Sequence, residues 1–309
     1  MYRKNFIASL MVICIILFSL ISCSANNESS KSSTVEIDGS STVFPISMAA
    51  AEIFRETHPE IQIPVGISGT GGGFKRFTVG EIAIVDASRP IKDQEVKDAT
   101  ENGIDFIELT VAFDGLSVIV NKSNDWVDCL TVEELHKVWD QGSNINNWNQ
   151  IRPSFPDVDM NLYGPGTDSG TFDYFTEVIN GQEGRTRSDY TPSEDDNVLV
   201  LGVSGDKGAM GYFGYAYYVE NIKRLKLLGI DDGNGCVMPS EASINDGTYS
   251  PLSRPLFIYV NTSEILRKEV YEFVKFYLEN GQMLANEGGF VALPQSMYDD
   301  GLSAIANNQ

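Results

Sequence analysis

The feature of this sequence that most constrains its fold is a glycine- and hydroxyl-rich turn that recurs between a short apolar strand and a helix. The turn appears as GSST at 39–42, GTGGG at 69–73 and GTDSGT at 166–171. Strands that alternate with helices through short turns are typical of βαβ units built around a parallel sheet. The pattern therefore predicts an α/β fold.

The spacing of apolar residues extends this prediction along the chain. Strands are expected at 34–38, 61–67, 81–86, 106–113, 116–121, 161–163, 210–213, 225–229 and 255–260. Helices are expected at 43–57, from about Phe74, at 93–102, from a capping box at Thr131–Glu134, after Thr171, at 193–203 and at 262–278. The strand pattern breaks at Asp114-Gly115 and then starts afresh. We therefore expect two lobes, the first from 35–110 and 253–309 and the second from 111–252.

The N-terminus has the pattern of a secretion signal. Arg3 and Lys4 precede an uncharged stretch from Phe6 to Ile21, which is short for a membrane-spanning helix. The sequence LISC at 20–23 resembles the lipobox of bacterial lipoproteins, so residues 1–22 are predicted to be a signal peptide and Cys23 a lipidated first residue. The alternative is a plain N-terminal anchor. Residues 23–34 are predicted to be a flexible tether, and the folded part is expected outside the cytoplasm.

Composition excludes several classes of function. The formal net charge is −21, which is unfavourable for binding a phosphate backbone, so no nucleic-acid partner is expected. Two His and four Cys leave little material for a zinc site or a Ser-His-Asp triad, and no metal or cofactor is predicted. Apart from Cys23, the cysteines that remain after the signal peptide are Cys129 and Cys236, and they form either a disulfide or two separate buried thiols.

Each glycine-rich turn is a candidate anion site. A helix N-terminus presents free backbone N–H groups, glycine allows close approach of the backbone, and hydroxyls add donors. For a single turn, ordinary N-capping explains the composition as well. Three such turns at the same edge of a sheet favour a shared anion site. The chain has no Walker-type phosphate loop, and GTGGG lacks the pattern and acidic partner of a dinucleotide fingerprint, so nucleotide binding is unsupported.

Arg89 follows the predicted third strand at the edge where the turns gather. Its guanidinium could donate two parallel hydrogen bonds to an oxyanion. The alternative is a surface arginine paired with Asp86 or Glu81.

Several longer motifs resemble one family. They are DGSSTVFP (38–45), GTGGGFK (69–75), DASRP (86–90), YGPGTDSGTF (163–172), YTPSEDDNVLV (190–200) and GDKGAMGYF (205–213). In this order, and over nearly all of the chain after the signal peptide, they resemble the PstS-type phosphate-binding lipoproteins that serve the phosphate ABC importer.

This resemblance implies a type II periplasmic-binding-protein fold with a phosphate cleft between two lobes. It implies phosphate contacts from Ser41, Thr42, Thr70, Gly71, Ser88, Arg89, Asp168, Ser169, Gly170 and Thr171. The best-known members carry an Asp where Arg89 stands, and an Arg where Pro165 and Gly166 stand. We therefore expect Arg89 to supply the positive charge. Asp168 is the first choice, and Asp86 the second, for the carboxylate that accepts the phosphate proton.

The resemblance implies a monomeric binding protein that acts with membrane permease subunits and is held at the membrane by its lipid anchor. A binding protein for sulfate, molybdate or tungstate is the first alternative. A secreted phosphatase is the second, but it would need a nucleophile with a base or a two-metal carboxylate cluster, and the sequence shows neither.

Overall fold

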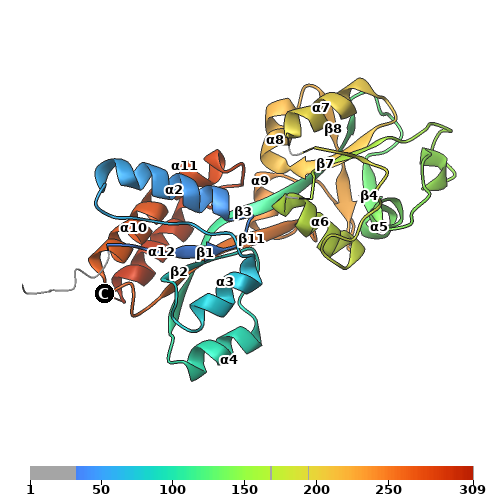
Figure 1. Ribbon diagram of the computed structural model, residues 1–309. Helices are drawn as coiled ribbons and strands as arrows, with labels where there is room; N and C mark the ends of the chain where they lie inside the picture. The colour runs from blue at the N-terminus through green and yellow to red at the C-terminus, as the bar shows by residue number, and fades with distance from the viewer. Residues whose placement is uncertain (1–32, 168, 194, 309) are drawn as a thin grey trace, which may run out of the picture. The chain divides into compact units, whose positions relative to one another are not determined.

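The computed structural model describes residues 33–167, 169–193 and 195–308, so the predicted signal peptide, Cys23 and Asp168 lie outside the described residues. The strands of its main sheet are β1 (Ile37–Gly39), β2 (Ile84–Ala87), β3 (Phe106–Asn121), β5 (Leu162–Gly164), β6 (Thr191–Pro192), β7 (Met210–Gly214), β8 (Leu225–Leu227) and β11 (Ser253–Asn261). Their order is β1-β2-β11-β3-β7-β5-β6, with β8 also paired to β3 (Figure 1). A smaller sheet contains β4 (Cys129–Thr131), β9 (Gly229–Asp231) and β10 (Cys236–Val237). The fold is mixed α/β, as predicted.

The helices pack on both faces of the main sheet. They are α2 (Phe44–Thr57), α3 (Thr70–Phe77), α4 (Asp93–Glu101), α5 (Val132–Trp139), α6 (Gly170–Asn180), α7 (Asp196–Gly205), α8 (Tyr215–Asn221), α9 (Glu241–Asn245), α10 (Lys268–Glu279), α11 (Gly281–Glu287) and α12 (Gln295–Ala306), with a 3-10 turn at Trp148–Gln150. Within the described part of the chain, none of these helices has the length and apolar character needed to cross a membrane.

The first lobe, lobe 1, is built on β1, β2 and β11 and on the first half of β3. Alternate residues of its strands point to opposite faces, as the pleat requires. Ile84 and Ile258 pack with α2, α10 and α12 in one buried cluster, whereas Val85 and Tyr259 pack with Phe74 of α3 in another. In Figure 1, α3 and α4 accordingly lie on the side of these strands away from α2.

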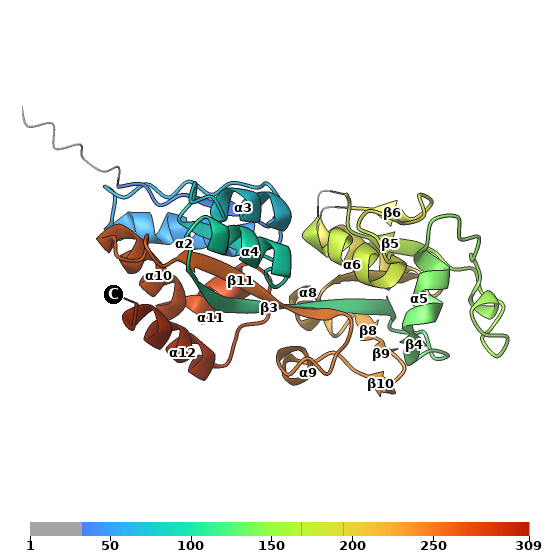
Figure 2. The ribbon, with the colours of Figure 1, turned by 90° about the horizontal axis from the view of Figure 1, so that it is seen from below.

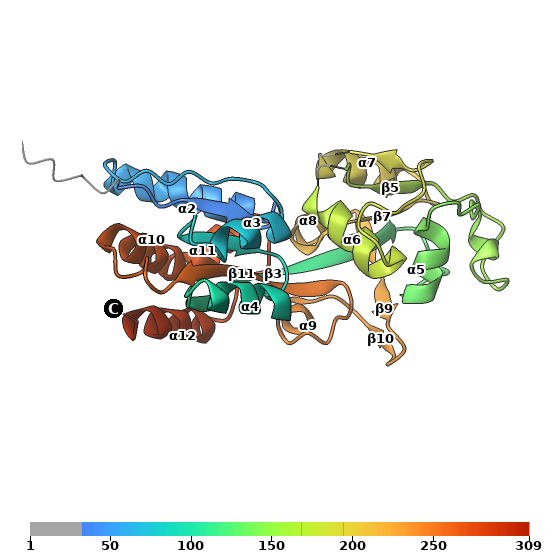
Figure 3. The same cartoon turned by 60° about the horizontal axis from the view of Figure 1, so that its bottom comes forward.

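Lobe 2 has separate buried clusters, drawn from residues 116–252 together with Val291. Strands β3 and β11 run side by side between the two lobes (Figure 3). The lobe boundaries at 110/111 and 252/253 stay a prediction.

The break expected at Asp114-Gly115 is wrong, because β3 is a single strand from Phe106 to Asn121. Asp114 pairs with Arg254 of β11 across the ladder, and Gly115 pairs with Ser253. A Cβ on Gly115 would lie 2.4 Å from a side-chain carbon of Ile244, so this glycine provides space for a neighbour and does not form a turn.

Three other predicted elements also differ. Helix α3 begins at Thr70, one turn before the expected start near Phe74. The segment 61–67 makes only isolated bridges, from Gln62 to Thr34 and from Val65 to Ile37, and is not a strand of the sheet. Helix α10 begins at Lys268 and not at 262. The side chain of Asn261 accepts hydrogen bonds from the backbone and hydroxyl of Ser263, which holds the chain in a turn after β11.

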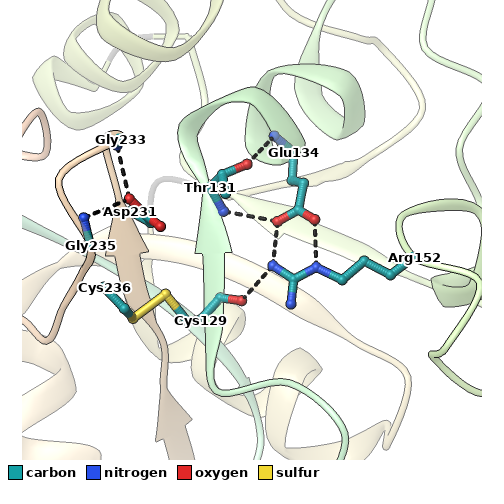
Figure 4. The surroundings of a disulfide bond; sticks show 8 residues. All are labelled: Cys129, Thr131, Glu134, Arg152, Asp231, Gly233, Gly235 and Cys236. Atoms are coloured by element: carbon teal, nitrogen blue, oxygen red, sulfur yellow. Dashed lines mark hydrogen bonds and ion pairs between the residues drawn. A yellow bond between two sulfur atoms is a disulfide. The ribbon is translucent and has the colours of Figure 1, made fainter.

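Cys129 and Cys236 form a disulfide in the small sheet, which resolves the alternative left open by the sequence (Figure 4). They lie on β4 and β10, the two strands that flank β9, with their Cα atoms 6.2 Å apart. Beside the disulfide, the predicted capping box of Thr131 and Glu134 is confirmed.

Candidate functional site

A cavity of about 330 Å³ brings together residues of both lobes. Its lining comprises Ser40, Ser41, Thr42, Gly69, Thr70, Gly71, Ser88, Arg89, Lys92, Asp173, Tyr174, Glu177, Glu183 and Arg254. Helix α3, which carries Thr70 and Gly71, belongs to lobe 1, and α6, which carries the acidic residues 173 and 177, belongs to lobe 2 (Figure 2). Most of the lining is polar, as a site for a charged ligand requires.

The second glycine-rich turn supplies backbone donors to this cavity, and the first lines it with Ser40, Ser41 and Thr42. Helices α2 and α3 both begin without a side-chain cap, since Val43 and Gly69 stand at their N-cap positions. The first N–H groups of a helix have no intrahelical partner, so at α3 those of Thr70 and Gly71 can donate to a ligand in the cavity. At α2 they are used within the protein, because Phe44 donates to Ser40, Pro45 has no N–H, and Ile46 and Ser47 donate to Val43. Gly69 has φ of 73°, a left-handed conformation that favours glycine.

Thr70 and Ser88 join the second turn to the end of β2. Their hydroxyl oxygens are 3.2 Å apart, and the backbone N–H of Ser88 donates to the Thr70 hydroxyl. Because both residues line the cavity, this contact places two hydroxyls side by side at its wall.

Arg89 lines the cavity, but its guanidinium is already paired. Both terminal nitrogens donate to the carboxylate of Glu95 at 2.8 Å, and the guanidinium lies 5.5 Å from the centre of the Phe74 ring. Burial alone would raise the pKa of Glu95, but the hydrogen bonds from Arg89 and from the backbone of Lys92 hold it below its ordinary value. Arg89 therefore faces the cavity as half of an ion pair. Its partner is neither Asp86 nor Glu81, the two acids considered from the sequence.

Arg254 is a second guanidinium in the cavity, and the sequence analysis missed it. Its side chain is 14% exposed, and it pairs at 3.2 Å with Asp114, which is 2% exposed. It also donates to the hydroxyl of Thr42 at 3.2 Å and to the carbonyl of Gly170 at 3.4 Å, and it lies 3.9 Å from the centre of the Tyr174 ring. Arg254 thus contacts both lobes. One signal in the sequence could have found it. Asp114 and Arg254 lie close to the two predicted lobe boundaries, at 110/111 and 252/253, where the chain was expected to pass between the lobes.

Burial raises the pKa of Asp114, and the charge and hydrogen bond of Arg254 oppose this increase. A carboxylate without solvent contact depends on such a partner to stay ionised. Asp114 therefore orients Arg254 from the buried side, while the guanidinium lines the cavity.

The third turn differs from the expectation. Ser169, Gly170 and Thr171 are not among the residues that line the cavity. The Ser169 hydroxyl caps α6 by accepting from the backbone N–H of Thr171. Gly170 instead lies directly against lobe 1, where an added Cβ would be 2.3 Å from the Thr42 hydroxyl oxygen. Their predicted role in binding stays a prediction, as does that of Asp168, which lies outside the described residues.

Three acidic residues line the cavity from lobe 2: Asp173, Glu177 and Glu183. Burial raises the pKa of Asp173 to about 6; Glu183 and Glu177 add to this effect, and Arg254 opposes it. The cations Arg89, Lys92 and Arg254 come from lobe 1 and β11. The two sides of the cavity therefore carry opposite charge.

Asp86, the second choice for the proton acceptor, does not line the cavity. It is fully buried in lobe 1, where it accepts a hydrogen bond from the Ser47 hydroxyl at 2.8 Å. Burial raises its pKa to about 8, the Ser47 hydrogen bond opposes this increase, and the nearby charge of Asp38 adds to it.

The described residues contain no cluster of three or more His, Cys, Asp or Glu side chains arranged to hold a metal ion. The cavity instead combines the uncapped start of α3, hydroxyls and guanidinium groups. This set of groups binds oxyanions.

Comparison with known proteins agrees with this geometry. Residues 24–280 match the family model described as a PBP superfamily domain. The chain is 38% identical to the phosphate-binding protein PstS of Staphylococcus aureus, over 88% of this chain and 83% of that protein. The chain belongs to the PBP superfamily and, within it, to the PstS-type binding proteins. The family resemblance found in the sequence is thereby confirmed, and the family is one of binding proteins and not of enzymes.

Two further relatives are more similar over a comparable length. The SphX protein of Synechococcus elongatus is 49% identical over 91% of this chain and 84% of that protein. The crystal structure of a possible phosphate-binding protein from Planctomyces limnophilus is 48% identical, with a TM-score of 0.85, and the match covers 89% of this chain and 98% of that one. The predicted type II binding-protein fold is confirmed by this match.

Proposed function

We propose that this chain is an extracytoplasmic lipoprotein that binds inorganic phosphate in the cavity and delivers it to a membrane ABC importer. The observation that carries the proposal is the cavity itself, which is lined by Arg254, by the start of α3 and by the hydroxyls of two turns. The names of the relatives support phosphate as the anion.

In this proposal the first two turns hold the phosphate oxygens. Ser41, Thr42, Thr70 and Gly71 donate from their N–H groups or hydroxyls, and Ser88 adds a hydroxyl beside Thr70. Such donors bind any tetrahedral oxyanion, so they set the shape of the site and not its choice between anions.

Arg254 supplies the main positive charge in this proposal, in place of Arg89. A hydrogen bond from a charged donor contributes about 1.5–3 kcal/mol, more than a neutral N–H. Asp114, the acidic partner of Arg254, is not part of the cavity lining, so it pairs with the guanidinium from the side away from the ligand. Both terminal nitrogens of Arg89, by contrast, donate to Glu95. Arg89 would have to exchange Glu95 for the ligand before it could bind with the same geometry.

The proposal is tested by isothermal titration of the folded chain, without its signal peptide, against phosphate, arsenate, sulfate and molybdate. We expect one-to-one binding of phosphate with arsenate as a competitor. A protein that binds sulfate or molybdate and ignores phosphate would instead be a carrier for another oxyanion, and hydrolysis of a phosphate ester would indicate a phosphatase.

The membrane part of the proposal rests on the LISC motif and on Cys23. Lipidation of Cys23 would hold the protein at the outer face of the membrane, near the permease subunits. The protein would act there as a monomer. A Cys23→Ala variant is expected to lose the lipid and leave the membrane fraction. If it is processed and retained like the native protein, the lipoprotein assignment is wrong.

A further inference from the structure

A second cavity, of about 470 Å³, also lies between the two lobes, and the proposed function does not use it. One of its walls comes from α8 and α9 of lobe 2, and the other comes from α11 and residues 290–294 of lobe 1. We call it the rear cavity, and the cavity that Arg254 lines the phosphate cavity.

The two cavities lie on opposite faces of the strand pair β3 and β11. Neighbouring residues of a strand point to opposite faces. Asp114 of β3 pairs with Arg254, which lines the phosphate cavity. The next residue, Gly115, faces the side chain of Ile244 in α9, a helix that contributes to the rear cavity. Figure 2 accordingly shows α3 and α6 on one side of these strands and α9 and α11 on the other.

The lining of the rear cavity combines apolar side chains with two carboxylates. Val219, Phe290 and Leu293 supply apolar surface, and the exposed residues Glu220 and Glu241 supply the carboxylates. Neither carboxylate makes a hydrogen bond or ion pair with a described residue. None of the described residues that line this cavity is a lysine, arginine or histidine, whereas three cations line the phosphate cavity. The rear cavity therefore repels anions and attracts a cation that also carries apolar surface.

We propose that the rear cavity binds a small organic cation, an ammonium group on an aromatic or alkyl body. The apolar body is buried against Val219, Phe290 and Leu293, and the ammonium donates charged hydrogen bonds to Glu220 and Glu241. The volume of the cavity lies within the range of about 300–1,000 Å³ that is typical of small-molecule sites. The site itself does not depend on the proposed function, and only its effect on phosphate does.

Both walls of the rear cavity are attached to the same short stretch of β3. Val291, in the wall from lobe 1, exchanges two backbone hydrogen bonds with Phe113, at 2.8 and 2.9 Å. Gly214, which leads directly into α8 in the wall from lobe 2, pairs with Leu116. Asp114 lies between these two points of attachment. A change in the direction of β3 between them therefore changes the distance between the walls.

The two cavities should respond to such a change in opposite ways. A phosphate ion fills only a fraction of the phosphate cavity, about 330 Å³, so the lobes must approach each other on that side to surround it. Because the strand pair lies between the cavities, this movement draws the walls of the rear cavity apart. A cation that contacts both walls then loses contacts. The cation and phosphate should therefore weaken each other's binding, by the same factor in both directions.

The first test is titration of three probes with one skeleton into the folded chain without its signal peptide. The probes are 4-phenylbutylamine, 4-phenylbutanol and 4-phenylbutyrate, which at neutral pH are positive, uncharged and negative. We expect the amine to bind most tightly and the butyrate most weakly. Glu220→Gln and Glu241→Gln should each weaken the amine by about twofold to fivefold and leave the alcohol unchanged.

The matched control is Glu287→Gln, which removes an exposed acid of α11 that does not line the cavity. It should keep the native affinities, which separates the site from the general attraction of an acidic chain for cations. Ala216→Trp places an indole ring in the cavity and should weaken all three probes by about tenfold or more, with thermal unfolding as the check on folding. If this variant does not fold, the glutamine variants still decide. Equal affinity for the amine and the butyrate, or unchanged binding in folded Ala216→Trp, overturns the site.

The second test is titration of phosphate in the presence of saturating 4-phenylbutylamine at matched ionic strength. Phosphate binding should weaken by about fivefold or more, and Ala216→Trp should abolish this effect. Glu177→Gln should keep it, since Glu177 lines the phosphate cavity and marks binding of the amine there. An unchanged phosphate affinity, or an effect that disappears in Glu177→Gln, overturns the coupling. Amine binding is measured without phosphate, so a chain that binds the amine and not phosphate would overturn the proposed function alone.

Discussion

Replacing Arg254 with alanine should cost more phosphate affinity than any other single change in the cavity. Arg254 is 14% exposed and makes a charged pair with an acid that is 2% exposed. Truncating the protein side of a buried, hydrogen-bonded charge pair between protein and ligand costs about 2–5 kcal/mol of binding free energy, which corresponds to a dissociation constant weakened by about 30-fold to several thousand-fold. Both terminal nitrogens of Arg89 already donate to Glu95, whereas the bonds of Arg254 to Asp114, Thr42 and Gly170 come from Nε and one terminal nitrogen. Arg89→Ala should therefore weaken binding by less than about tenfold, or about 1.4 kcal/mol.

The same substitution should destabilise the protein, and this effect must be separated from binding. Without Arg254, the carboxylate of Asp114 is buried without its cation, which typically costs about 3–5 kcal/mol unless the group takes up a proton. The double variant Arg254→Ala/Asp114→Asn removes that buried charge. It should recover most of the free energy of unfolding while the phosphate affinity stays low.

The assay is isothermal titration of phosphate into the native protein and these variants, together with urea unfolding of each. Arg254→Lys should recover only part of the affinity, because lysine keeps the charge and loses the planar fork. Near-native affinity in Arg254→Ala, with a large loss in Arg89→Ala, would refute the reasoning and return the main charge to Arg89.

Three further changes test other features. The double variant Cys129→Ser/Cys236→Ser should lower the free energy of unfolding by about 2–5 kcal/mol in urea titrations, since the disulfide joins residues that are 107 apart along the chain. Burial raises the pKa of Asp86 from 3.8 to about 8, so the native state keeps a proton that the unfolded state has lost, and this group destabilises the fold increasingly as pH rises from about 4 to about 8. Asp86→Asn should gain stability relative to the native protein over that range, by a few kcal/mol at pH 9. Gly170→Ala places a Cβ 2.3 Å from the Thr42 hydroxyl oxygen, and it should weaken phosphate binding by about 1–3 kcal/mol in a titration.

Each of these changes has a control. A reductant should destabilise the native protein and leave the double serine variant unchanged. A stability difference between Asp86→Asn and the native protein that is independent of pH would contradict the pKa argument. Gly205→Ala, where an added Cβ meets nothing within 4 Å, should bind phosphate normally; equal losses in both glycine variants would contradict the contact with Thr42.

Much of the fold could be predicted because local signals and packing agree. The capping box at Thr131 is a local feature, and the sequence places it where the structure has it. The start of α3 was placed near Phe74, one turn too late, because glycines disfavour a helix by propensity, yet Gly71 to Gly73 lie within α3. The strand break at Asp114 was predicted wrongly, because a polar residue followed by glycine is typical of a turn. Here the polar residue pairs across the ladder, and the glycine provides space for Ile244.

The site was harder to predict because its charges depend on contacts between distant segments. Arg89 could be placed at the sheet edge from the sequence, but nothing local indicated that Glu95 would take both of its terminal nitrogens. Arg254 and Asp114 are 140 residues apart along the chain. Their pairing can be predicted only when β11 is known to lie beside β3 and the register of the two strands is known.

That register has a mechanical consequence. Arg254 and Asp114 are directly opposite each other on the two strands that pass between the lobes, two residues before the irregularity in the ladder between Leu256 and Phe257. Because backbone hydrogen bonds hold the strands together, the lobes can separate only if this two-stranded ribbon bends or twists. The resistance of this ribbon to twisting therefore limits the angle by which the lobes can open. An anion bound to Arg254 would contact the ribbon directly, since Arg254 lies on β11.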